Sequence, residues 1–182
     1  DAWTWEHMAL CRSRVVFGPV AAAEALEGEI RRFLALPRDH EKLHGDVLEM
    51  RATMAASKPP KGPLDVKLMR GGLVDIEFLT HFLQLRHGTA LTPSVGEALA
   101  QLISARHLPS AILPAYHLFT RLLVTLRLVS PNSALPPPAC RAIVASAAHE
   151  SGWETMLADL ASAREQVADA WRAIFDQKLE LD

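Results

Sequence analysis

The chain has 182 residues, of which 49% are hydrophobic and 22% charged, a composition typical of a folded globular protein rather than a disordered one. Its formal net charge is −2, so no basic excess favours nucleic acid or an anionic membrane as a partner, and we expect neither. The two cysteines, Cys11 and Cys140, lie far apart without the spacing of a disulfide framework or a zinc site, which favours the cytoplasm.

Apolar residues recur at three- and four-residue spacing along most of the chain, which is the pattern of amphipathic helices. We predict helices over residues 2–17, 20–36, 40–57, 73–87, 94–106, 110–129, 138–149 and 153–179. No segment shows a clear strand pattern, and no apolar run approaches the roughly 18 residues of a membrane span. The first residues lack the pattern of a secretory leader, and we expect none. The expected fold is all-α, an irregular bundle of about seven helices forming a single helical domain over residues 1–182.

Prolines, glycines and a capping residue mark several of the predicted helix ends. Pro37 stops the second helix, Asp39 is suited to cap the third, and Gly88 ends the fourth. The second helix carries one apolar face, formed by Val20, Ala23, Leu26, Ile30, Phe33 and Leu34. We expect the sixth helix to be central and buried, with a face formed by Leu113, Tyr116, His117, Thr120, Leu123, Val124 and Arg127.

Residues 58–71, here called the connector, interrupt the helical pattern. Three prolines and Gly62 exclude a regular helix there, and Gly71 with Gly72 allows a turn that residues with a Cβ resist. We predict an extended backbone over 64–69, with Val66 and Leu68 pointing one way and Asp65, Lys67 and Met69 the other.

Asp75 and Glu77, at the start of the fourth predicted helix, invite a metal-binding interpretation that helix geometry opposes. Side chains two positions apart leave a helix about 200° apart, so the two carboxylates cannot chelate one ion side by side, and we predict no metal site. Asp75 shares its face with the apolar Phe78, Leu79 and Phe82, and Glu77 shares a polar face with Thr80, His81 and Gln84. We interpret Asp75 as a structural strut, favoured by the free amides of the first turn and by a cation drawn from Arg12, Arg14, Lys67 or Arg70.

Lys67 and Arg70 are the best candidates for contact with a ligand, because they lie on a glycine-terminated connector where donors can meet phosphate oxygens. The alternative is that both are ordinary solvated charges. We expect Trp3 and Trp5 to be core or domain-interface anchors rather than a stacking platform for a ligand. The His40/His44 pair at i,i+4 spacing lacks a third metal ligand and is interpreted as a solvated face.

The sequence contains no phosphate-binding P-loop, nucleophile elbow, zinc-protease motif or dinucleotide-binding glycine loop. Two stretches nevertheless resemble glutamine synthetase adenylyltransferases. The first runs from Ala2-Trp3-Thr4-Trp5-Glu6-His7-Met8-Ala9-Leu10 to Arg12-Ser13-Arg14-Val15-Val16, with Glu49-Met50-Arg51 further on. The second is Asp65-Val66-Lys67 followed by Gly71-Gly72-Leu73-Val74-Asp75-Ile76-Glu77-Phe78. The resemblance covers residues 2–88 well, and 89–182 only in helical character and in a closing helix that bears a tryptophan.

In that family one half of a fused enzyme removes AMP from a tyrosine of glutamine synthetase and the other half adds it. The resemblance implies that this chain is the C-terminal helical domain of the adenylylating half. An upstream nucleotidyltransferase domain would hold ATP and Mg²⁺, so no catalytic residue is expected in this chain, which alone would be inactive and would bind no tight cofactor. Lys67, with Arg70 second, would contact ATP phosphates or glutamine synthetase, while Asp75 and Glu77, with Arg12 and Arg14, would hold the connector. The chain starts with Asp1 rather than Met, and we expect it to be a piece of a longer protein.

Two other interpretations stay open at this point. In the first of these, the chain is a regulatory module that binds a PII-type signal protein, glutamine or glutamine synthetase. In the second, it is a generic all-α adaptor domain.

Overall fold

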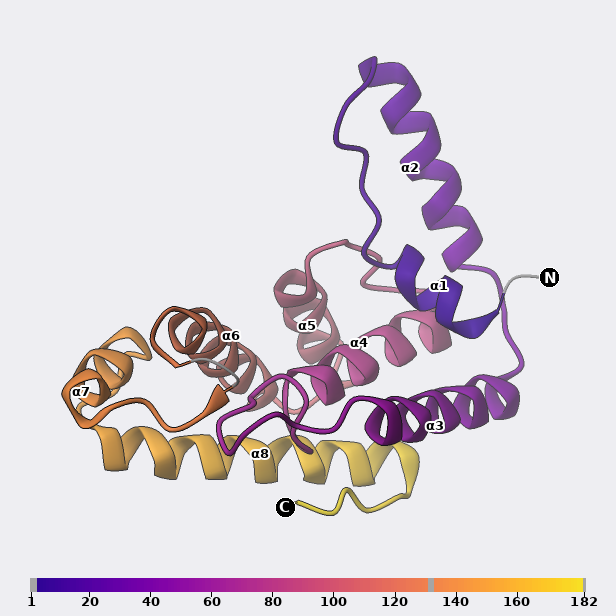
Figure 1. Ribbon diagram of the computed structural model, residues 1–182. Coiled ribbons are helices and arrows are strands. Elements are labelled where there is room, and N and C mark those ends of the chain that lie inside the picture. Colours follow the sequence, from indigo (N-terminus) through magenta and orange to yellow (C-terminus); the bar gives the residue numbers. More distant parts are fainter. Residues whose placement is uncertain (1–2, 131–132, 182) are drawn as a thin grey trace. The chain divides into compact units, whose positions relative to one another are not determined.

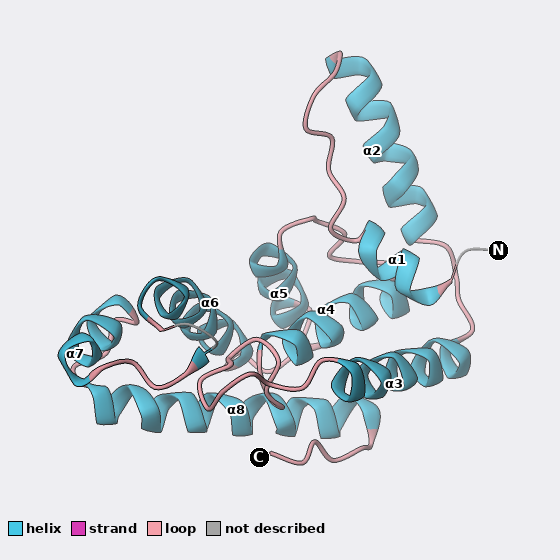
Figure 2. Ribbon diagram, viewed as in Figure 1, coloured by secondary structure: helices cyan, strands magenta, loops and turns pink. Residues whose placement is uncertain are grey.

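A computed structural model describes residues 3–130 and 133–181, and those residues form eight helices and no strand. The all-α prediction is confirmed, and each of the eight helices lies within one of the eight predicted ranges, although we expected a bundle of about seven (Figure 1, Figure 2). The helices are α1 (Thr4–Leu10), α2 (Val20–Leu34), α3 (His40–Ser57), α4 (Leu73–His87), α5 (Val95–Ser104), α6 (Ile112–Val129), α7 (Pro138–Ala147) and α8 (Trp153–Phe175). Three parts of the chain lie outside the described residues: residues 1–2, where we predicted the start of the first helix, positions 131–132 of the proline-rich loop, and the last residue.

The chain divides into two compact units, and α3 and α4 each contribute residues to both. Unit 1 contains Asp1–Arg51 and Glu77–Leu108, and unit 2 contains Ala52–Ile76 and Pro109–Asp182. The expectation of a single domain over the whole chain stays a prediction.

Five of the eight predicted helices end earlier than expected, and the first and the last do so by more than two residues. The first helix ends at Leu10 because the chain turns there: the Arg12 N–H donates to the Ala9 carbonyl at 3.1 Å, and the Val15 N–H donates to the Glu27 carboxylate of α2 at 3.1 Å. The last helix ends at Phe175 rather than 179, because Asp176 adopts a left-handed conformation with φ +49° that cannot continue an α-helix.

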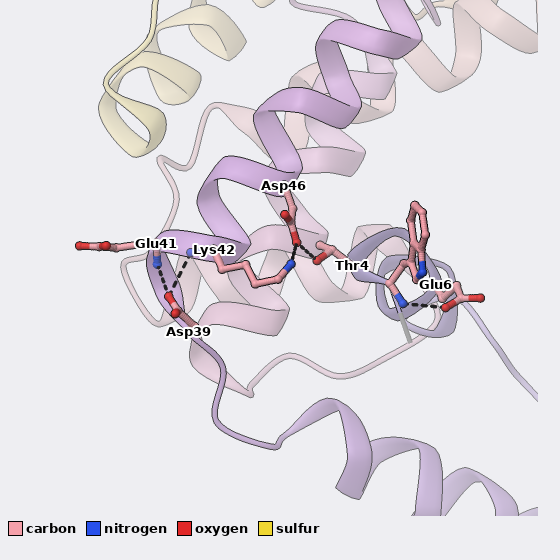
Figure 3. A network of polar contacts seen from close by, with 7 residues as sticks. Thr4, Glu6, Asp39, Glu41, Lys42 and Asp46 are labelled. Atoms are coloured by element: carbon pink, nitrogen blue, oxygen red, sulfur yellow. Dashed lines mark hydrogen bonds and ion pairs between the residues drawn. The ribbon is translucent and has the colours of Figure 1, made fainter. Parts of the chain in front are cut away.

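In unit 1, a polar network ties α1 to α3 (Figure 3). The Thr4 hydroxyl donates to the Asp46 carboxylate, which also accepts from the Lys42 ammonium at 2.6 Å. The hydrogen bond from Lys42 has the larger effect and that from Thr4 the smaller, and together they hold the pKa of Asp46 below its usual value. Asp39 caps α3 as predicted, because its carboxylate accepts from the N–H groups of Glu41 and Lys42, each at 3.0 Å.

The part of α4 within unit 1 is buried on both of its expected faces. Thr80, His81 and Gln84, which we assigned to a polar face, are all buried together with the apolar residues Leu79, Phe82, Leu83 and Leu85. The Gln84 side chain contacts His81 Nδ1 at 2.8 Å and donates to the Ala90 carbonyl at 2.6 Å. This polar face therefore satisfies much of its hydrogen bonding inside the unit rather than with solvent.

Several aromatic and apolar side chains of unit 1 are exposed, against expectation. Trp3 and Trp5 are 71% and 52% exposed, so the interpretation as core residues is wrong, and a role at a domain interface stays a prediction. Of the apolar face predicted for α2, only Leu34 is buried, and Val20 and Leu26 face solvent.

In unit 2, α6, α7 and α8 pack against one another (Figure 1). The buried side of α6 consists of Ile112, Ala115, Leu118, Phe119, Leu122 and Leu126. The predicted face was wrong: Leu113, Tyr116, Thr120 and Leu123 are half-buried, and His117, Val124 and Arg127 are exposed. The helix is apolar around most of its circumference, so periodicity did not identify the side that packs. By length and hydropathy α6 is the one helix of the described residues that meets the criterion for a membrane span, which the core helices of globular units also meet.

Candidate functional site

The connector folds as a series of turns and not as the extended segment that we predicted for 64–69. Asp65 explains the difference, since its buried carboxylate accepts from the N–H of Lys61 at 3.0 Å and from the N–H of Leu68 at 3.1 Å. Such local bonds from a side chain to the backbone compete with extended structure. Asp65, Val66 and Met69 are all buried, so the predicted alternation of side chains is absent from the structure.

Backbone hydrogen bonds join the connector to the first turn of α4. The N–H of Leu73 donates to the Val66 carbonyl at 2.9 Å, and the N–H of Val74 donates to the Lys67 carbonyl at 3.1 Å. These bonds satisfy amides that the start of a helix leaves without partners inside the helix. The backbone of Lys67 is therefore held in place by the helix that follows it.

The two glycines before α4 make this close approach possible. Gly71 has φ +72°, a conformation that side chains resist, and a Cβ there would lie 2.6 Å from the Arg164 carbonyl oxygen. At Gly72, a Cβ would lie 2.6 Å from the carbonyl oxygen of Val66 and 2.8 Å from that of Met69. The turn predicted at this pair is present, and it requires both residues to lack a side chain.

Asp75 lies in the first turn of α4 with 0% of its surface exposed. Its carboxylate accepts from the Gly71 N–H at 2.7 Å. On the other side of the connector, Arg164 of α8 donates from Nε to the Arg70 carbonyl at 3.0 Å. The geometry has the form expected of a strut, and the orienting role of Asp75 stays a prediction.

A groove of about 780 Å³ in unit 2 lies beside the connector. Its apolar lining comes from Met54, Pro59, Pro60, Leu64, Leu68, Leu123 and Leu126, and its polar lining from Ser57, Lys58, Lys61, Asp65, Lys67, Arg127, Ser130 and Ser133. Lys67 is half-buried in this wall, and its contact with a ligand stays a prediction. Arg70 is not among the lining residues, so the structure brings only one of the two predicted contact residues to the groove.

Three further cations of the groove, Lys58, Lys61 and Arg127, were not identified as candidates from the sequence. Lys58 and Lys61 belong to the same charged connector, which was a usable signal. Arg127 comes from the last turn of α6, and only the tertiary fold brings it to the connector.

The remaining predicted orienting residues lie in unit 1. Arg12 donates to the Glu77 carboxylate at 3.1 Å across a partly exposed surface, and Arg14 is exposed. An exposed pair of this kind contributes at most about 1 kcal/mol to stability. Within residues 3–130 and 133–181, no three His, Cys, Asp or Glu side chains gather, so the donor set of this part of the chain does not fit a Mg²⁺ site.

Comparison with known proteins identifies relatives of one kind. The chain is 39% identical over 140 residues to the bifunctional glutamine synthetase adenylyltransferase/adenylyl-removing enzyme of Brucella suis, a match that covers 74% of the chain. It is 34% identical over 191 residues to the enzyme of the same name from Xanthobacter autotrophicus, covering 99% of the chain, and 37% identical over 186 residues to that of Caulobacter vibrioides, covering 96%. No protein-family model matches the sequence.

These matches span only 14% of the length of the first relative and 19% of that of the other two. The chain is therefore homologous to a segment of glutamine synthetase adenylyltransferases, as the sequence motifs indicated.

Proposed function

We propose that this chain, a homologue of a segment of glutamine synthetase adenylyltransferases, works as the helical C-terminal domain of such an enzyme, in its adenylylating half. The complete enzyme would act in the cytoplasm, where it transfers AMP from ATP to a tyrosine of glutamine synthetase and so regulates nitrogen assimilation. Homology along nearly the whole chain supports the assignment to this enzyme, and the cationic groove beside the connector supports a role in binding substrate.

In this proposal the groove forms one wall of the cleft that takes ATP or glutamine synthetase, and Lys67 is the residue that reaches the ligand. Its backbone carbonyl is bonded to the first turn of α4, so the side chain starts from a fixed point. Positioning and charge neutralisation are the main contributions that a protein makes to nucleotidyl transfer. Asp75 and Glu77 would hold the surrounding segments. Arg70, which does not line the groove, would be a second contact residue outside it. Mg²⁺ would be held by the upstream nucleotidyltransferase domain.

The decisive experiment measures adenylylation of glutamine synthetase by the complete enzyme with Lys67→Ala. We expect kcat/KM to fall by roughly 10- to 100-fold, because one charged donor to a developing negative charge is removed at a partly exposed position. Lys178→Ala is the matched control, since Lys178 is exposed and does not line the groove. An unchanged rate in Lys67→Ala, with the control also unchanged, would remove Lys67 from the mechanism.

A second candidate function is a regulatory module that binds a PII-type signal protein, glutamine or glutamine synthetase. The observation that favours it is the set of apolar side chains exposed on α2 and before it, since Val16 is 86% and Phe17 98% exposed. Retention of a PII-type protein by the immobilised chain would support this regulatory function. A slower adenylylation by Lys67→Ala, without retention of a PII-type protein, would favour the role in the adenylylating half.

A further inference from the structure

We propose that the groove beside the connector is a binding site for the polyphosphate chain of a nucleotide, contacted by Lys58, Lys61 and Arg127 together with Lys67. This inference deepens the proposed function, on which it rests for the choice of a nucleotide as the phosphate ligand. The cationic character of the groove does not depend on that choice.

The four cations reach the groove from separate parts of unit 2. Lys58 and Lys61 come from the first part of the connector, directly after α3, and Lys67 comes from its middle. Arg127 comes from the last turn of α6. A ligand in the groove would therefore meet positive charge from the connector and from α6.

Among the described residues that line the groove, four cations face a single carboxylate. Asp65 is the only acidic residue among the described lining residues, and it is 5% exposed, with its two oxygens accepting from the N–H groups of Lys61 and Leu68. Within residues 3–130 and 133–181, the side chains of the four cations have no ion-pair partner. Like charges that line one concave surface repel each other and attract an anion.

The size and lining of the groove suit a nucleotide. A volume of about 780 Å³ lies within the range of small-molecule sites, which runs from about 300 to 1,000 Å³. Leucines from the connector and from α6 provide an apolar surface for a base beside the cations. Phosphate groups concentrate more negative charge and more acceptor oxygens than a carboxylate does, so a polyphosphate matches four cations in one groove better than an acidic peptide.

The test is calorimetric titration of the 182-residue chain with sodium tripolyphosphate and with ATP, at about 0.1 M and about 1 M salt. We expect both compounds to bind at the lower salt concentration and to bind at least about 10-fold more weakly at the higher one, where screening is stronger. Arg127→Ala should weaken binding by about 3- to 30-fold, as expected for a charge-assisted hydrogen bond at an exposed site. Arg127→Lys keeps the charge and should retain most of the affinity.

Two controls separate this site from nonspecific attraction. Lys178→Ala removes an exposed lysine outside the groove and should leave the affinity unchanged, and the melting temperature of each variant shows whether it is folded. The inference is overturned if tripolyphosphate does not bind, or if Lys178→Ala weakens binding as much as Arg127→Ala. Binding of a polyglutamate peptide without binding of tripolyphosphate would also overturn it, and would make the groove a protein-docking site.

The outcomes also separate this inference from the proposed function. If tripolyphosphate fails to bind but Lys67→Ala slows adenylylation, only the polyphosphate site is wrong. If tripolyphosphate binds through Arg127 but Lys67→Ala leaves the rate unchanged, the site stands and the role of Lys67 in catalysis fails.

Discussion

Replacement of Asp75 by alanine tests whether this carboxylate holds the connector. The carboxylate is completely buried and accepts from the Gly71 N–H at 2.7 Å. Without it, a buried donor loses its acceptor, which costs about 1–3 kcal/mol, and the first turn of α4 loses a negative charge worth about 0.3–1 kcal/mol. The free energy of unfolding should therefore fall by about 1–4 kcal/mol. For a chain of this length that corresponds to a melting temperature roughly 3–16 °C lower.

The assay is thermal and urea unfolding of the 182-residue chain, followed by circular dichroism. Asp75→Asn keeps an acceptor oxygen for Gly71 and loses the charge, so its melting temperature should lie between those of the wild type and Asp75→Ala. Glu29→Ala is the control, because it removes an exposed carboxylate of α2 and should change stability by less than about 0.5 kcal/mol. If Asp75→Ala melts like the wild type while remaining folded, the interpretation as a strut is wrong.

Two further predictions concern the glycine pair and a buried histidine. Gly72→Ala places a Cβ within 2.8 Å of two backbone oxygens and should destabilise the chain by about 1–3 kcal/mol. Gly45 has open space around it, so Gly45→Ala should stabilise α3 by about 0.5–1 kcal/mol. If the urea midpoints of the two variants move in the same direction, the steric argument is contradicted. Burial lowers the pKa of His81 below 6.5, so the unfolded state binds the proton more strongly, and stability should be fully present above about pH 6.5 and fall as the pH drops below it. Urea midpoints measured across this range should show a smaller pH dependence in His81→Gln, and a histidine NMR titration that places the pKa of His81 above 6.5 would refute the prediction.

The bounds of α3 and α4 could be predicted because local residues determine them. Pro37 and the Asp39 cap fix the start of α3, and the glycine pair and Gly88 bracket α4. Helix faces were harder to predict, because several helices carry apolar residues on more than one side. On α6 the predicted face was wrong, since the buried residues are Ile112, Ala115, Leu118, Phe119, Leu122 and Leu126.

The connector shows how local chemistry overrides a simple pattern. Alternating side chains over 64–69 predicted an extended segment, but the Asp65 carboxylate binds two nearby amides and folds the chain into turns. The charged character of this stretch and its place before α4 were visible in the sequence. The residues that identify the candidate site, Lys67 above all, could therefore be named before the fold was known, whereas their surroundings could not.

The sequence by itself determined the all-α class and the relation to glutamine synthetase adenylyltransferases, because propensity, capping and motifs depend on residues close together in the chain. Only the tertiary structure decided which cations share a groove. Arg127 joins Lys58, Lys61 and Lys67 there, while Arg70 is absent from the lining. Such a grouping depends on how α6 packs in unit 2, and contacts between residues distant in the chain leave no local pattern.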